Sequence, residues 1–180
     1  GSTVAIAGHN VKLGRGGIRE VEFFTQTQQL IWGGRDPDLR SPFTVQSIEA
    51  LVTAERVTPA VAQDMIDAYR YLRRLEHRLQ MVDDQQTHSL PDTDEGLDAV
   101  AAFMGYGDRE SFEAELMRTL RTVESHYAEL FEESEPLGGG GTLVFTGADD
   151  HPDTLATLRE MGFSDPESIS TAIRAWHAGR

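Results

Sequence analysis

"TPAVAQDMIDAYRYLRRLEHRLQMV", residues 58 to 82, is the stretch that decides the fold. Its apolar residues recur at intervals of three and four, the period of one face of an α-helix. Thr58 and Pro59 stand in the order of an N-cap and a first helical residue. About 24 residues at a rise of 1.5 Å give a helix roughly 36 Å long, a length typical of a bundle. We expect its buried stripe to contain Val61, Met65, Ala68, Tyr69, Leu72, Leu75, Leu79 and Val82.

The same periodicity predicts helices on both sides of this one. Two long helices and several shorter ones, joined by short polar loops, predict an all-α fold. We therefore expect an antiparallel long-helix bundle over residues 18–135. Its other helices are expected from Ile18 to the glycines Gly33 and Gly34, from about Pro42 to Ala54, from Glu95 to Met104 and from Arg109 to about Glu133.

The two ends of the chain differ from the bundle in composition. Residues 3–13 favour β structure, so we expect 1–17 to be an inter-domain segment with an edge strand or an extended arm. Gly138 to Gly141 predict a Gly-rich linker over 136–150. Residues 151–180 predict a small helical hairpin, with helices at Pro152–Met161 and Pro166–His177. A hairpin this small is expected to dock on the bundle or on the rest of a longer protein.

Charge and composition exclude several classes of function. The net charge of −14 over 180 residues argues against general nucleic-acid binding, which needs a basic face. The chain has no cysteine, so disulfides, thiolate metal sites and a cysteine nucleophile are excluded. No apolar run approaches the roughly 18 residues of a membrane span. We expect a cytoplasmic protein without a membrane partner.

"NVKLGRGGIREVEFF", residues 10 to 24, is the candidate functional stretch. Backbone amides at a glycine turn before a helix form a natural anion site, and cations nearby add charge-assisted bonds to phosphate. The spacing matches neither a P-loop nor the dinucleotide-binding glycine pattern. The alternative is a tight turn with surface ion pairs. The candidate residues for phosphate, substrate or inter-domain contact are Lys12, Arg15, Gly16, Gly17, Arg19, Glu20 and Glu22.

Acidic residues elsewhere do not form a convincing catalytic pair or metal site. Asp36 and Asp38 have Asp-x-Asp spacing, but they flank Pro37 and are interpreted as turn residues. A second acidic and histidine-containing group lies in the last turns of the long helix and just after it, and we interpret it as helix-end and turn structure. We therefore expect neither a catalytic residue nor a metal site. The members of that second group are Glu76, His77, Asp83, Asp84 and His88.

Two long motifs carry a resemblance to a known family. "VKLGRGGIREVEFFTQTQQLIWGGRDPDLR", residues 11 to 40, resembles the bifunctional glutamine synthetase adenylyltransferase/adenylyl-removing enzymes. "YLRRLEHRLQMVDDQQTHSLP", residues 71 to 91, is similar to a second motif of the same family, in the same order. The Ile-Arg-Glu and Gln-Thr…Leu-Pro forms of these motifs look more like the amino-terminal, deadenylylating half of these enzymes than like their adenylylating half. The resemblance covers at least residues 10–135, and residues 143–180 are similar to the segment that follows in the family.

The resemblance implies a helical domain without its catalytic neighbour. In this family a nucleotidyltransferase domain carries a Gly-Ser turn followed by two metal-binding aspartates, and this chain has no such pair after a Gly-Ser. The parent enzyme would remove AMP from glutamine synthetase by phosphorolysis with Mg²⁺ and would also use ATP. Glutamine synthetase, the PII signal protein and the parent's nucleotidyltransferase domains are the implied partners. The chain alone is expected to be inactive and to bind none of these cofactors.

Two alternatives remain open at this point. The acidic bundle could be an interaction module that binds a regulator such as PII without touching a nucleotide. It could also be the helical domain of a related uridylyltransferase, although the second motif fits the adenylyltransferase better.

Overall fold

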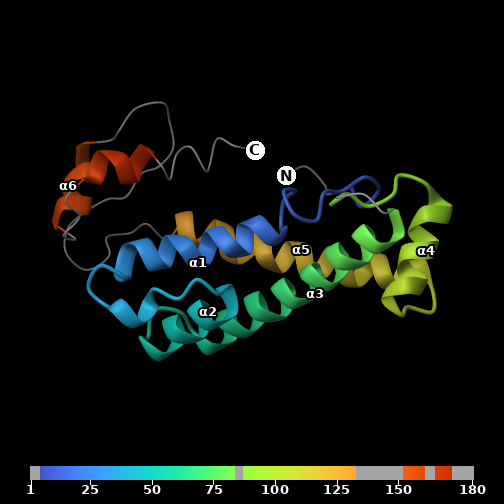
Figure 1. The fold of residues 1–180 in the computed structure, drawn as a ribbon, viewed down its shortest axis with the longest axis horizontal. Helices are drawn as coiled ribbons and strands as arrows, with labels where there is room; N and C mark the ends of the chain where they lie inside the picture. Colours follow the sequence, from blue (N-terminus) through green and yellow to red (C-terminus); the bar gives the residue numbers. More distant parts are fainter. Residues whose placement is uncertain (1–4, 84–86, 133–151, 161–164, 172–180) are drawn as a thin grey trace.

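The computed structural model describes residues 5–83, 87–132, 152–160 and 165–171, where the regular elements are helices and there is no β-strand. Two long helices, α3 and α5, run past each other and carry the shorter elements at their ends (Figure 1). The all-α prediction is therefore confirmed. The elements are α1 (Ile18–Trp32), the 3-10 turn η1 (Pro37–Leu39), α2 (Thr44–Thr53), α3 (Pro59–Asp83), α4 (Asp94–Met104), α5 (Arg109–Glu132) and α6 (Pro152–Glu160).

The helix boundaries follow local signals in the sequence. The Val61 amide donates to Thr58 Oγ1 over 3.3 Å, so Thr58 caps α3 as expected. Gly33 ends α1 as expected, because its amide donates back to the Gln29 carbonyl. Thr93 caps α4 by accepting from the Gly96 amide, a cap that the sequence analysis did not identify. The boundaries of the bundle helices are thus decided largely by residues at the ends themselves.

The two larger clusters of the described core lie at opposite ends of α3. One joins the start of α3 to α1 and α2, and includes Phe24, Ile48 and Met65. The other joins the end of α3 to α4 and α5, and includes Leu75 and Phe112. Of the stripe expected along α3, Met65, Ala68, Leu72, Leu75 and Leu79 are buried, Val61 and Tyr69 are half-buried, and the side chain of Val82 lies outside the described residues.

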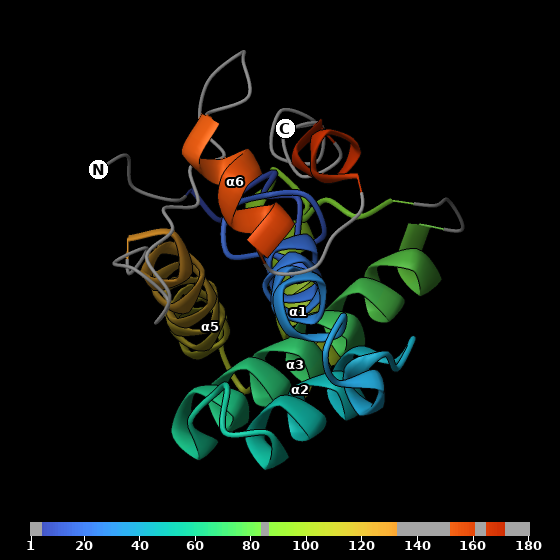
Figure 2. The same cartoon turned by 90° about the vertical axis from the view of Figure 1, so that its left-hand side faces the viewer.

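α1 is the central short helix, because it contacts α2, α3 and α5. Figure 2 shows α1 between α5 on one side and α2 and α3 below it. Polar residues hold the connection from α1 to α2. Gln29 Nε2 donates to the carbonyls of Leu39 and Ser41 over 2.6 and 2.8 Å. Asp36 accepts from the Asp38 amide, which confirms that these aspartates are turn residues.

The segment before α1 differs from the prediction of an edge strand or extended arm. Residues 6–17 form successive turns, and within the described ranges their β-pairing with another segment is limited to the isolated bridge Asn10–Ser89. Asn10 Oδ1 accepts from the amides of Lys12 and Leu13, which closes the turn locally. Val11 is fully buried in the core cluster of α4 and α5. The β-leaning composition was therefore overridden by side-chain capping and burial.

The predicted hairpin is seen in part. α6 and the helical residues 166–171 begin at the expected prolines. Ile169 packs against the Phe23–Tyr127 pair of α1 and α5. The predicted linker over 136–150 and the end of the second helix lie outside the described residues, so their structure stays a prediction.

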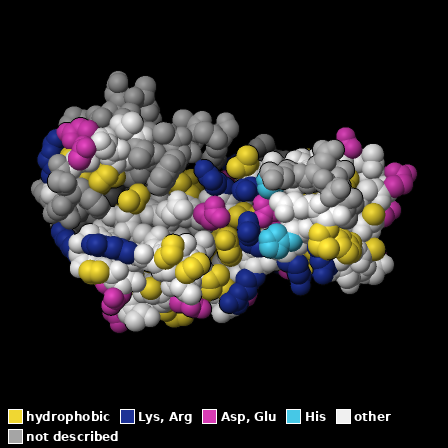
Figure 3. All heavy atoms as spheres, in the orientation of Figure 1, with side chains coloured by type: hydrophobic (Ala, Val, Ile, Leu, Met, Phe, Trp, Pro, Cys, Tyr) yellow, Lys and Arg dark blue, Asp and Glu magenta, His cyan; other side chains and the backbone are white. Residues whose placement is uncertain are grey.

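The surface combines a strongly acidic total charge with a local basic region. Figure 3 shows dark-blue Lys and Arg side chains, together with histidines, gathered near the middle of the face over α3. None of the helices in the described ranges is both long and apolar enough to cross a membrane.

Asp108 provides a pH-dependent cap for α5. Its carboxylate accepts from the Ser111 amide over 2.7 Å and from the Ser111 hydroxyl over 2.9 Å, and the backbone bond is the larger cause of its lowered pKa. A lowered pKa in the folded state means that the stabilisation is present above the unfolded pKa of about 3.9. It is lost as the pH falls through the pKa of the folded protein.

We expect Asp108→Ala to lower the melting temperature at pH 7, and the difference from the original protein should shrink steadily below about pH 4. Thermal unfolding followed by circular dichroism at a series of pH values measures this. Asp92→Ala, at an exposed loop position, is the control and should show no such trend. A difference that stays constant to pH 2 would contradict the role of the ionised carboxylate.

Candidate functional site

The two motifs that carry the resemblance lie against each other in the structure. Backbone bonds join the segment before α1 to the segment before α4. The Val11 amide donates to the His88 carbonyl over 2.8 Å, and the Leu90 amide donates to the His9 carbonyl over 2.9 Å. Residues about 80 positions apart in sequence therefore form one local unit at the start of α1.

Glycines in this unit allow the backbone to approach neighbouring segments closely. Gly16 has a φ of +71°, a conformation that L-residues with a side chain rarely adopt. A Cβ atom at Gly16 would lie 2.1 Å from the carbonyl oxygen of Leu120 on α5. A Cβ atom at Gly17 would lie 2.7 Å from the Gly14 carbonyl oxygen. The glycines thus place the start of α1 directly on α5.

The backbone amides at the start of α1 are engaged within the chain. Ile18, Arg19 and Glu20 donate their amides to the carbonyls of Val11, Lys12 and Gly17, each over 3.0 Å. The Gly16 amide donates to the Glu20 carboxylate over 2.9 Å, an arrangement similar to a capping box. These amides are therefore occupied rather than free for an anion, and any anion contact here falls to the side chains.

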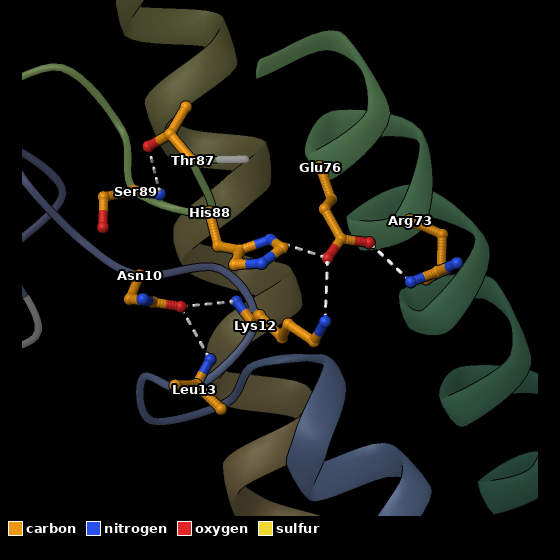
Figure 4. Close-up of polar contacts among 8 residues, drawn as sticks. All are labelled: Asn10, Lys12, Leu13, Arg73, Glu76, Thr87, His88 and Ser89. Atoms are coloured by element: carbon orange, nitrogen blue, oxygen red, sulfur yellow. Dashed lines mark hydrogen bonds and ion pairs between the residues drawn. The ribbon is translucent and has the colours of Figure 1, made fainter. Parts of the chain in front are cut away.

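Glu76 is the centre of the unit and is 1% exposed. Three groups surround its carboxylate, as Figure 4 shows. Arg73 lies 2.5 Å from Oε2, and Lys12 Nζ lies 3.7 Å from Oε1. His88 Nδ1 lies 2.9 Å from Oε1, but neither atom has a directed hydrogen-bond partner among the described residues. The buried carboxylate thus ties the segment before α1 to α3 and to residue 88.

His9 lies in the same unit and is half-buried. Burial lowers its pKa, because desolvation disfavours the charged imidazolium. Its Nε2 has no hydrogen-bond partner among the described residues. A Cβ atom at Gly14 would lie 2.6 Å from the His9 ring, so this glycine makes room for the histidine. No sequence pattern points to His9, because a single histidine carries no spacing signal.

The remaining candidates divide between an ion pair and an open surface. Arg15 pairs with Glu124 of α5 over 2.5 Å, which fixes the glycine turn to that helix. The side chain of Arg19 is exposed and makes no hydrogen bond or ion pair with any described residue, while Glu22 is half-buried. Lys12 and Arg15 thus pair with carboxylates on α3 and α5, whereas the side chain of Arg19 is exposed to solvent.

The role of Glu76 could have been found from the sequence. It falls on the apolar stripe of α3, between Leu72 and Leu79, where a carboxylate needs a partner. Arg73 lies three positions earlier and is one such partner. The partners Lys12 and His88 come from distant segments, and no local pattern identifies them.

Metal binding has no support in the described ranges, where no group of three His, Cys, Asp or Glu side chains could hold an ion. Glu76 and His88 do meet, but Lys12 and Arg73 complete their cluster with positive charge. His77 is exposed on another side of α3. Asp84 lies outside the described residues.

Comparisons with known proteins agree with the resemblance. The family model described as GlnD PII-uridylyltransferase matches residues 1–131. Curated relatives named bifunctional glutamine synthetase adenylyltransferase/adenylyl-removing enzyme are similar over nearly the whole chain. The relative from Rhizobium meliloti is 52% identical over 98% of the chain, that from Caulobacter vibrioides 53% over 96%, and that from Bradyrhizobium diazoefficiens 46% over 99%. In each case the chain spans 18% of the relative's length.

Proposed function

The chain belongs to the family described as GlnD PII-uridylyltransferase and shares about half its residues with bifunctional glutamine synthetase adenylyltransferase/adenylyl-removing enzymes, and from this premise we propose its function. It is the non-catalytic helical domain that follows the deadenylylating nucleotidyltransferase domain. Its task is to support substrate recognition while the parent removes AMP from glutamine synthetase. The observation that carries this proposal is the 52% identity to such an enzyme over 98% of the chain.

The geometry supports a contact role at the start of α1. Arg15 and Arg19 are exposed there, beside a unit that is rigidly fixed to α3 and α5 by Glu76 and Glu124. A guanidinium can bind a phosphate or carboxylate through two parallel bonds. The two arginines therefore either touch the phosphate of the substrate or hold the neighbouring catalytic domain.

The cofactors belong to the parent rather than to this domain. Among the described residues no cluster of acids and histidines suits Mg²⁺. Mg²⁺ and ATP or AMP would be held by the nucleotidyltransferase domains, where paired aspartates support metal-assisted transfer. Glutamine synthetase, the PII signal protein and those domains are the proposed partners, and the proposed location is the cytoplasm.

A second candidate function has one observation in its favour. The family model carries the description of a PII-uridylyltransferase. A domain shared by enzymes that modify PII and by enzymes that respond to it suits a regulator-binding module. In that case the bundle binds PII or a similar regulator, and the arginines at α1 contact no nucleotide.

Phosphate contact and regulator binding predict different effects of the double change Arg15→Ala with Arg19→Ala in the complete enzyme. Contact with the phosphate predicts that kcat/KM for phosphate-dependent AMP release from adenylylated glutamine synthetase falls about tenfold or more. AMP release measured over a range of phosphate concentrations tests this. Arg118→Ala with Arg121→Ala removes the same charge from α5 and should change the rate less than about twofold.

One further variant separates structure from substrate contact. Glu124→Gln breaks the ion pair of Arg15 and leaves both arginines in place. If Glu124→Gln reduces AMP release as strongly as the double change at Arg15 and Arg19 does, Arg15 only fixes the turn. If the double change at Arg15 and Arg19 leaves the kinetics unaltered, the substrate-contact role is wrong and the regulator-binding module is favoured.

A further inference from the structure

A groove lined by arginines runs along the exposed side of α3. We call it the arginine groove, and it has a volume of about 490 Å³. Its basic lining consists of Arg70, Arg73, Arg74, His77 and Arg78, with Met81 at one end, and no carboxylate is among the described residues that line it. In Figure 3 basic side chains gather with a histidine on this part of the face. The groove is separate from Lys12, Arg15 and Arg19.

The concentration of positive charge stands out against the composition of the chain. The sequence has 30 acidic and 16 basic residues, and four of those basic residues line this one groove. Like charges on neighbouring turns of a helix repel each other, so the arrangement is mildly unfavourable unless an anion joins it. An acidic protein that gathers arginines in one place is suited to bind a negatively charged partner there.

Several of these cations have no anionic partner in the part of the chain that the structure describes. Arg73 is neutralised by Glu76. The side chains of Arg70 and His77 make no hydrogen bond or ion pair with any described residue, and both are exposed. Arg74 lies 5.7 Å from the ring of Tyr71 and forms no ion pair within the described ranges. Arg78 donates to the Phe103 carbonyl, and its guanidinium keeps further donors.

The arginines form a row rather than a single focus. Arg70, Arg74 and Arg78 are four residues apart, so they follow one another along the helix axis at about 6 Å. The guanidinium of Arg74 lies 5.7 Å from the ring of Tyr71, and that of Arg78 lies 5.2 Å from the ring of Phe103, so the two have different neighbours along the groove. A single phosphate needs donors that converge on one point. A row at about 6 Å instead matches alternate residues of an extended peptide, which lie about 6.6 Å apart.

We propose that the arginine groove docks an extended acidic segment of a partner protein. Carboxylates at alternate positions of that segment face Arg70, Arg74 and Arg78, and an apolar residue of the segment covers Met81, which is 72% exposed. Nucleic acid fits less well, because its phosphates would continue beyond the groove over a chain of net charge −14. This docking role does not depend on the proposed function in AMP removal.

The test uses this chain and a fluorescent peptide of alternating Glu and Ser residues, with binding followed by fluorescence anisotropy. The proposal predicts saturable binding that weakens with salt. Arg70→Ala with Arg74→Ala should raise the dissociation constant about tenfold or more. Arg118→Ala with Arg121→Ala on α5 removes the same charge and should change it less than about twofold.

Matched ligands identify the chemistry that the groove recognises. A peptide with Gln in place of Glu should not bind, and one with its Glu residues in a single block should bind about threefold more weakly or worse. The proposal is overturned if the Gln peptide binds equally, if both arginine pairs have equal effects, or if no peptide binds. Displacement of the peptide by inorganic phosphate or tripolyphosphate at equal or lower concentration would overturn it in favour of a phosphoryl site.

Discussion

Gly16→Ala should lower the free energy of unfolding by about 4 kcal/mol, the largest effect that we expect of a single methyl group. Two causes add. The positive φ of Gly16 is unfavourable for alanine by about 1 kcal/mol. The new Cβ would also meet the Leu120 carbonyl oxygen at 2.1 Å, which is backbone and cannot rotate away. α1 must then move off α5, and core contacts are lost.

Two other glycines separate these causes in urea unfolding experiments. Gly8 has a φ of +69° with nothing near its Cβ position, so Gly8→Ala should lower the free energy by only about 1 kcal/mol. Gly107 has open space and no positive φ, so Gly107→Ala should stay within about 0.5 kcal/mol. If Gly16→Ala is no worse than Gly8→Ala, the close contact with α5 is not part of the native structure.

Glu76→Ala should lower the free energy of unfolding by about 3 kcal/mol. Removal of one member of a buried ion pair leaves charge without its partner and also leaves a cavity. The side chains of Lys12 and Arg73 remain 33% and 37% exposed, so they can reach water and the loss stays at the lower end of the range for buried pairs. Urea unfolding followed by circular dichroism measures the change.

Glu115 is a matched control for Glu76. It also pairs with an arginine three residues away, Arg118, but its side chain is 37% exposed. Exposed pairs of this kind contribute about 0–1 kcal/mol, so Glu115→Ala should have a small effect. Equal losses in the two variants would show that the Glu76 cluster contributes no more than a surface pair. Hydrogen exchange at the Val11 and Leu90 amides should also speed up in Glu76→Ala alone, because the carboxylate holds that segment in place.

The helices were predictable because their causes are local. The three- and four-residue spacing of apolar residues predicted helices over residues 59–82 and 109–133. The structure has these helices at Pro59–Asp83 and Arg109–Glu132. Thr58, Gly33 and the aspartates around Pro37 act through bonds to residues a few positions away. Periodicity also separated most buried residues of α3 from exposed ones, since one face of a helix is a property of spacing alone.

The segment before α1 was not predictable in this way. Its residues favour an extended strand by composition, yet the structure has turns, because Asn10 caps the backbone and Val11 enters the core. The spacing of the glycines also left open an anion site or a tight turn, and in the structure the amides of that turn already donate within the chain. The glycines serve a close approach to Leu120, which lies about 100 residues away in sequence.

The sequence by itself determined the helix boundaries, the bundle class and the two motifs that mark the family, because these depend on spacing and residue type within a few turns. The tertiary structure alone decided that the motifs meet, that Glu76 receives Lys12, Arg73 and His88, and that Gly16 rests on α5. It also decided that the arginines of α3 line an open groove. Such long-range pairings follow from how whole helices pack, since the burial of their apolar faces sets which distant side chains become neighbours.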